Sequence, residues 1–154
     1  MKKNLLNRAL RIDKLTLAAL ESTLRLYLDQ ETVIGNIPTL RMLTITVDEL
    51  EQRAVNFRER IQHALPDSVV IHIHEDTSQV GGGALPSQQL PTRVVALSSP
   101  TLSLQDLERG LRENIPSVIA RIHKDQLRID LRTVLEHEEA TLEKALAAVI
   151  ASLV

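Results

Sequence analysis

Cysteine and tryptophan are absent from this 154-residue chain, and Tyr27 and Phe57 are its single tyrosine and phenylalanine. The absence of cysteine excludes a disulfide framework, a thiolate metal site and a cysteine nucleophile. Because so few aromatic rings are present, the core must be built from leucine, isoleucine, valine and alanine. The same scarcity leaves few ring surfaces on which nucleic-acid bases could stack.

An excess of charge of one sign is also missing. The 18 lysines and arginines nearly balance the 20 aspartates and glutamates, for a formal net charge of −2, so no global basic field indicates nucleic-acid binding. No apolar run approaches the roughly 20 residues that span a bilayer, and the basic start at residues 1–3 is not followed by the apolar stretch of a signal peptide. We therefore expect a soluble, cytoplasmic protein without a membrane segment.

The first helix is the most apolar segment of the sequence. Asp13 is a plausible N-cap for a helix that ends near Leu28, and leucines occupy most of its circumference. Such a helix is expected to be buried. The segment 29–38 that follows contains Gly35-Asn36 and is predicted to be a linker, since Pro38 discourages helix immediately before it.

The rest of the chain alternates between helical and extended patterns. Thr46 and Glu49 form a capping-box signature that opens a second helix, and Lys124-Asp125 is a plausible hairpin turn. The predicted helices are 47–65, 103–114 and 136–153, and the predicted strands are 69–75, 93–97, 118–123 and 126–131. This order predicts an α+β fold: a small, mainly antiparallel sheet with helices on one face, preceded by the long first helix. We divide the chain into residues 1–45 and 46–154.

Arg8 and Arg11 are a candidate anion site. If their segment is helical, the three-residue spacing places both guanidinium groups on one face, where they could bind a phosphate through charge-assisted hydrogen bonds. The alternative is a solvated basic N-terminus. Lys14 falls on the one charged line of its helix, which favours a solvated lysine over a nucleophile.

Two other groups of residues could bind a ligand. The run Gly81-Gly82-Gly83 allows backbone to approach a ligand closely, but it has neither dinucleotide-binding nor P-loop spacing. His72 and His74 share one face of a predicted strand, and no third ligand converges on them, so no metal site is predicted and their role stays unassigned. His63, His123 and His137 are interpreted as surface residues.

Several blocks of sequence together resemble the bacterial selenocysteine synthases, the L-seryl-tRNA(Sec) selenium transferases. The blocks are residues 8–21, 23–28, 37–43, 78–86 and 130–134, and they occur in order along most of the chain. The resemblance implies a pyridoxal-phosphate enzyme of fold type I that converts seryl-tRNA(Sec) to selenocysteinyl-tRNA(Sec) with selenophosphate. It implies that residues 1–45 are the end of the large cofactor domain and that residues 46–154 are its small C-terminal domain.

The resemblance also implies roles for particular residues. Arg8 and Arg11 match the arginines that the family uses at its selenium-donor site, and a loop comprising Gln79, Gly81, Gly82 and Gly83 would lie near the active-site mouth. The lysine that forms the cofactor Schiff base lies upstream of the arginine block in the family, in a context that this sequence lacks. The chain is therefore expected to be a C-terminal fragment that binds no pyridoxal phosphate and is inactive alone. The family also implies a homo-oligomer.

Two alternatives remain open at this point. The chain could come from a related pyridoxal-phosphate lyase that acts on a small amino acid or amino sugar without tRNA. It could also be a non-catalytic oligomerisation module that pairs with full-length subunits.

Overall fold

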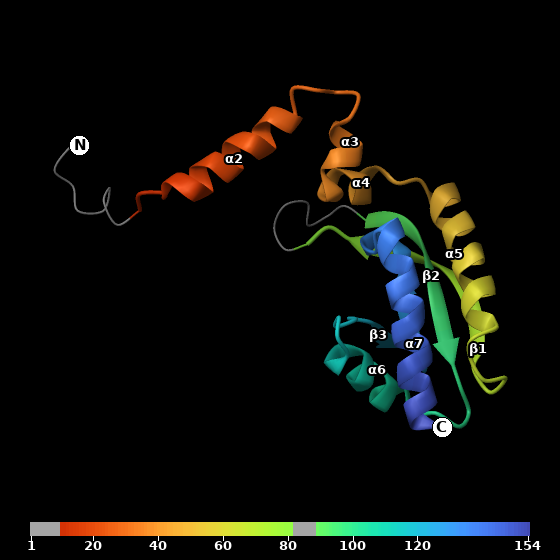
Figure 1. Ribbon diagram of the computed structural model, residues 1–154. Helices are drawn as coiled ribbons and strands as arrows, with labels where there is room; N and C mark the ends of the chain where they lie inside the picture. The colour runs from red at the N-terminus through yellow and green to blue at the C-terminus, as the bar shows by residue number, and fades with distance from the viewer. Residues whose placement is uncertain (1–9, 82–88) are drawn as a thin grey trace. The chain divides into compact units, whose positions relative to one another are not determined.

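The computed structural model describes residues 10–81 and 89–154, and the chain divides into two units, Met1–Thr44 and Ile45–Val154 (Figure 1). This division lies next to the boundary expected after residue 45. Arg8, Gly82 and Gly83, three of the predicted site residues, lie outside the described residues. None of the helices in the described ranges is long and apolar enough to cross a membrane.

The first unit is led by helix α2, Lys14–Leu26, which begins where the sequence predicts. The Asp13 carboxylate accepts hydrogen bonds from the backbone N–H of Leu15 and of Thr16, at 2.9 and 3.0 Å, which confirms it as the N-cap. Within this chain α2 buries none of its residues, so the described residues do not supply the burial expected for it. Its leucines need a surface that the helix itself does not supply.

The linker predicted over residues 29–38 is partly helical. Helix α3 spans Val33–Asn36, and helix α4 spans Pro38–Thr44 with proline in its first turn, where the missing N–H costs nothing. Asp29 closes the preceding turn by accepting a 2.7 Å hydrogen bond from the Thr32 hydroxyl. Both helices are too short to produce the apolar periodicity on which the sequence prediction relied.

The second unit is an α+β fold, as predicted. Its helices are α5 (Val47–Gln62), α6 (Leu104–Glu113) and α7 (Glu139–Leu153), and its strands are β1 (Val70–Gln79), β2 (Gln89–Ser98), β3 (Arg121–His123) and β4 (Gln126–Asp130). Short 3-10 turns at Leu131–Thr133 and Glu136–Glu138 lead into α7. The four strands form one antiparallel sheet in the order β1-β2-β4-β3.

Local sequence chemistry explains two of these elements. At the start of α5, the backbone N–H of Thr46 donates to the Glu49 carboxylate at 3.0 Å and the N–H of Glu49 donates to the Thr46 hydroxyl at 3.2 Å, which confirms the capping box. Lys124 and Asp125 both have positive φ, 51° and 55°. Two such residues in succession make the tight turn that joins β3 to β4 and confirm the predicted hairpin.

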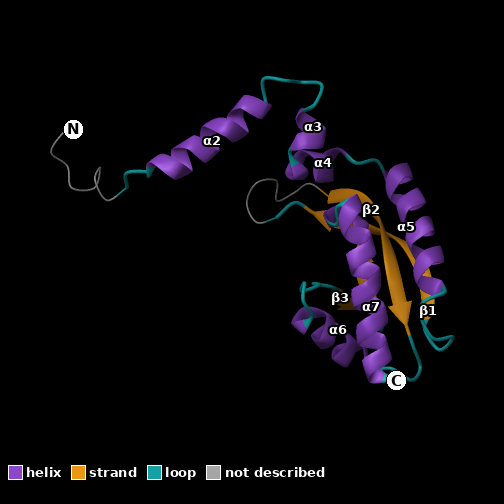
Figure 2. Ribbon diagram, viewed as in Figure 1, coloured by secondary structure: helices purple, strands orange, loops and turns teal. Residues whose placement is uncertain are grey.

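The sheet has two different faces. Alternate residues of the strands, such as Val95, Leu97 and Leu127, pack with the buried side chains of α5, α6 and α7 in a single hydrophobic core. Figure 2 shows helices α5 and α7 running beside the strands of this sheet. The opposite face carries mostly polar side chains. Helices α6 and α7 lie so close together at Gly110 that the Cβ of any other residue there would be 2.6 Å from a Val149 methyl carbon.

Candidate functional site

Arg11 is the only member of the predicted arginine pair within the described residues. It is exposed and lies in a non-helical segment, since α2 begins at Lys14. The helical spacing assumed for the pair is therefore not met at Arg11. The next charged group is Asp13, whose pKa is lowered chiefly by the hydrogen bond from the Thr16 hydroxyl. Arg11 is thus a solvent-accessible cation just before an N-capped helix.

Gln79 is the last residue of β1 and Gly81 lies two residues beyond the strand, and both are exposed. In the register of the sheet, Gln79 pairs with Gln89, while β4 pairs only with residues 94–97 of β2. Within the described residues, the ends of β1 and β2 therefore run past β4 as a two-stranded ribbon, residues 76–79 paired with 89–92. We call this segment the ribbon.

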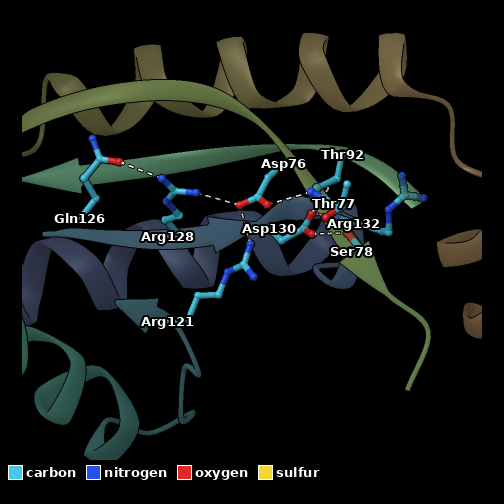
Figure 3. A network of polar contacts seen from close by, with 9 residues as sticks. All are labelled: Asp76, Thr77, Ser78, Thr92, Arg121, Gln126, Arg128, Asp130 and Arg132. Atoms are coloured by element: carbon cyan, nitrogen blue, oxygen red, sulfur yellow. Dashed lines mark hydrogen bonds and ion pairs between the residues drawn. The ribbon is translucent and has the colours of Figure 1, made fainter. Parts of the chain in front are cut away.

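Asp130, the last residue of β4, is bonded to both strands of the ribbon (Figure 3). One carboxylate oxygen accepts from the Ser78 hydroxyl at 2.5 Å, and the other accepts from the Thr92 hydroxyl at 2.9 Å. The second oxygen also accepts from the backbone N–H of Arg132 at 3.0 Å. Thr92 is fully buried, so this carboxylate satisfies a hydroxyl that water does not reach.

Arg132 connects the ribbon to the beginning of the second unit. Its guanidinium donates to the carbonyl oxygen of Pro91 at 2.6 Å and to that of Ile45 at 3.3 Å. The side chain is largely buried, and this burial lowers the pKa of Arg132 although the charge of Asp130 opposes the shift. A buried guanidinium bonded to two backbone carbonyls fixes the positions of both.

A second polar group occupies the same face of the sheet. Asp76 accepts hydrogen bonds from Arg121 at 2.6 Å and from Arg128 at 2.9 Å, which joins β1 to β3 and β4 across the open face (Figure 3). Burial acts to raise the pKa of Asp76, but the N–H of Thr77 and the two guanidinium groups outweigh it, so the pKa is lowered.

His72 and His74 share one face of β1, as predicted. Their rings are stacked, with centroids 5.7 Å apart. The described part of the chain contains no group of three or more histidine or carboxylate side chains that could hold a metal ion. The pair alone offers two ligands, fewer than a zinc site requires.

A groove of about 550 Å³ was not anticipated from the sequence. It lies between the segment before β3 and the start of α7, and its lining includes Ser117, Val118, Ile129, Val134, His137 and Leu142. His137, which the sequence predicts to be a surface residue, is exposed at this groove. The lining residues come from three separate segments, within residues 116–119, 129–134 and 137–142, so no single local motif reveals the groove.

Comparison with known proteins identifies the family. A family model described as "L-seryl-tRNA selenium transferase" matches residues 1–135. The chain belongs to this family. It is 45% identical over 149 residues to an L-seryl-tRNA(Sec) selenium transferase of Alkaliphilus metalliredigens, and this match covers 97% of the chain and 32% of the relative. It is 44% identical to that of Geobacter sulfurreducens and 47% identical to that of Geotalea uraniireducens, each over 146 residues, 95% of the chain and 32% of the relative.

The chain thus spans about a third of the length of these selenium transferases. The matched region includes the arginine segment, the ribbon and the Asp130–Arg132 segment. The structure brings the last two together through the bonds to Ser78, Thr92 and Pro91. Arg11 belongs to the first unit, and the ribbon and the Asp130–Arg132 segment belong to the second.

The selenium transferase family is known to use pyridoxal phosphate, and the described residues do not form a site for it. All three lysines in the described ranges, Lys14, Lys124 and Lys144, are exposed. A Schiff-base lysine needs desolvation or a cationic neighbour to be nucleophilic near neutral pH. No step of the cofactor chemistry is therefore assigned to these residues.

Proposed function

We propose that this chain forms the selenium-donor part of an L-seryl-tRNA(Sec) selenium transferase and that it acts together with the remaining two-thirds of such an enzyme. The observation that carries the proposal is the family match over residues 1–135, together with 44–47% identity to three named selenium transferases. In the complete enzyme, seryl-tRNA(Sec) is converted to selenocysteinyl-tRNA(Sec), with selenophosphate as donor and in the cytoplasm.

Arg8 and Arg11 are the residues proposed to hold the phosphate of selenophosphate. A guanidinium group presents several N–H donors in a planar fork that fits the oxygens of a phosphate. Arg11 is exposed and has no carboxylate among its described hydrogen-bond or ion-pair partners, so it is available to a soluble anion. Gln79, the last residue of β1, and Gly81, two residues further on, are proposed to lie near the active-site mouth of the complete enzyme.

The remaining requirements of the reaction are assigned outside this chain. The pyridoxal phosphate and its Schiff-base lysine belong to the other part of the enzyme, because the described lysines are exposed. The residues 46–154 are proposed to be the small C-terminal domain of a fold type I enzyme. The chain alone is expected to be inactive, and its complete enzyme is expected to be a homo-oligomer.

A chimera tests the proposed function. The matching third of the Alkaliphilus metalliredigens relative is replaced by this chain, and selenium transfer from selenophosphate to seryl-tRNA(Sec) is measured. The expected result is activity in the chimera and none in the chain alone. The corresponding third of the Geobacter sulfurreducens relative, which is about as similar to this chain as the Alkaliphilus segment, serves as the control graft.

If the control graft is active and the chimera with this chain is inactive, the proposal is wrong. Conversion of a free amino acid or amino sugar by the chimera, without transfer to tRNA, would identify the related lyase instead.

A second candidate function, a non-catalytic oligomerisation module, is favoured by one observation. Leu15, Leu17 and Leu24 of α2 are 84%, 52% and 56% exposed, and such an apolar helix is unusual on a free surface. Co-purification of the chain with a full-length selenium transferase, in the absence of any gain in activity, would support this role. An active chimera would exclude the claim that the chain has no part in catalysis.

A further inference from the structure

We infer that Asp130 and Arg132 are positioning residues that hold the ribbon, and with it Gln79, in place for the selenium-transfer reaction. Together we call them the ribbon clamp. The inference rests on the proposed function for its link to the reaction. The clamp itself rests on distances and burial in the second unit.

The ribbon needs such support because it extends beyond the sheet. Within the described residues, β4 pairs with β2 only up to the pair of Val94 with Asp130. Beyond this pair, β1 and β2 continue as two strands, from Asp76 opposite Thr92 to Gln79 opposite Gln89. A two-stranded ribbon in water is marginally stable by itself. Its geometry therefore depends on what is bonded to its base.

The clamp bonds to both strands of the ribbon. Asp130 accepts from Ser78 on β1 and from Thr92 on β2, at 2.5 and 2.9 Å. Arg132 donates to the Pro91 carbonyl on β2 at 2.6 Å. Pro91 has no backbone N–H, so its carbonyl oxygen is the only backbone group through which β2 can be bonded at this residue. The strands are thus fixed in position relative to each other and to β4.

Arg132 also extends the clamp to the start of the unit, through its 3.3 Å hydrogen bond to the Ile45 carbonyl. Asp130 and Arg132 are themselves joined, because the Arg132 backbone N–H donates to the Asp130 carboxylate at 3.0 Å. Partial burial of the Asp130 carboxylate and burial of the Arg132 guanidinium are costly, and apolar residues of similar size would commonly be as stable. Buried polar networks of this kind specify one arrangement, since an incorrect position leaves donors or acceptors unsatisfied.

The consequence concerns Gln79, which directly follows Ser78 at the end of β1. Loss of the clamp is expected to leave the core intact and to let the end of the ribbon sample other positions. Small displacements of a substrate-positioning group can lower an enzymatic rate strongly. Asp130 and Arg132 are thus expected to act on the reaction through the ribbon and without touching substrate.

Hydrogen exchange on the chain itself tests the clamp. In Asp130→Ala, exchange of the ribbon amides of residues 78–79 and 89–90 is expected to rise about tenfold or more, because the hydroxyls of Ser78 and Thr92 lose their acceptor. Amides of Ile71 and Leu97 at the other end of the same strands should change much less. Asp130→Asn should restore most of the protection, since an amide oxygen still accepts from Thr92 and from the Arg132 N–H.

Glu139→Ala is the matched control. Glu139, at the start of α7, is a largely buried carboxylate that accepts from Arg53 and Arg60 of α5, and its described bonds include none to the ribbon. It should lower the melting temperature without a selective change in ribbon exchange. Should Asp130→Ala not fold, two other variants test the clamp: Ser78→Ala removes one of its bonds to β1, and Arg132→Met removes its bond to the Pro91 carbonyl. Both are expected to give the same selective increase in exchange.

Steady-state kinetics of the active chimera then test the link to the reaction. Asp130→Ala should lower kcat/KM for selenium transfer about tenfold or more, Asp130→Asn should restore most of it, and Glu139→Ala should leave it near the parent value in the folded protein. An unchanged ribbon in Asp130→Ala, or a uniform rise in exchange over the whole unit, would overturn the clamp. Faster ribbon exchange with unchanged kcat/KM would overturn the positioning role. An inactive parent chimera would refute the proposed function and, with it, the positioning role. In that case the exchange experiment on the chain alone still decides whether the clamp holds the ribbon.

Discussion

Helices α2 and α7 are similar in length and both are rich in apolar residues, yet they end in opposite environments. Helix α7 buries Leu142, Ala145, Leu146, Val149 and Ile150 in the core of the second unit. Helix α2 buries nothing. An apolar composition therefore indicates that a helix needs a covering surface, but it does not indicate which part of the protein provides that surface. For α7 the covering surface lies within this chain, and for α2 we propose that it is provided by the rest of a selenium transferase.

The largest effect on the free energy of unfolding should come from removing a core side chain of the second unit. Phe57→Ala empties a fully buried position in α5 and should lower the free energy of unfolding of the second unit by about 3–5 kcal/mol. Leu20→Ala in α2 should change it by less than about 0.5 kcal/mol, because Leu20 is 47% exposed. Chemical denaturation of both variants measures the difference. An equally large loss in Leu20→Ala would mean that α2 is covered in the isolated chain.

Removing a charge from an ion pair should have an intermediate effect on the free energy of unfolding at the start of α7 and a negligible effect in α2. Glu139 accepts from Arg53 at 2.7 Å and from Arg60 at 2.7 Å, and the Glu139 and Arg53 side chains are only 12% and 13% exposed. Glu139→Gln should cost about 2–3 kcal/mol, because it leaves the largely buried guanidinium of Arg53 with a weaker acceptor.

The matched change in α2 is Glu21→Gln, which breaks an exposed pair with Arg25. Urea unfolding of this variant should agree with the parent to within about 0.5 kcal/mol, since exposed pairs contribute little. Equal costs for the two glutamates would contradict the contrast between the regions.

The smallest effect concerns how the stability of the second unit depends on pH in acid. The pKa of Asp76 in the second unit is lowered in the folded state, so its contribution to stability is present above the ordinary pKa, about 4, and is lost as the pH falls through the lowered value. In Asp76→Asn, this part of the pH dependence should disappear. The pKa of Asp13 is lowered as well, but Asp13→Asn should leave acid unfolding of the second unit unchanged, because Asp13 only caps α2. Acid titrations of unfolding, followed by circular dichroism, measure both variants.

Much of the fold could be predicted from the sequence, because local chemistry determines it. The Asp13 cap, the Thr46–Glu49 capping box and the Lys124-Asp125 turn each act within four residues. Helices α3 and α4 were missed because four and seven residues are too few for a periodic pattern. The strands β1 and β2 were predicted too short, because their polar ends become strands only by pairing with each other.

The candidate site was only partly predictable for the same reason. The shared face of His72 and His74 follows from the two-residue period of a strand. The clamp does not follow from any local pattern, because Asp130 is bonded to residues 38 and 52 positions away, and Arg132 to residues 41 and 87 positions away. The only sequence signal at Asp130 and Arg132 was their place in a block that resembles the family.

The most direct test of the account is the KM for selenophosphate in the chimera. Arg8→Gln and Arg11→Gln should each raise this KM about tenfold or more, because each removes charge-assisted hydrogen bonds to the donor phosphate. Lys14→Gln, which removes a neighbouring exposed cation, should change it by less than about twofold. An unchanged KM in both arginine variants, or an equal rise in Lys14→Gln, would contradict the assignment of the selenium-donor site to this chain.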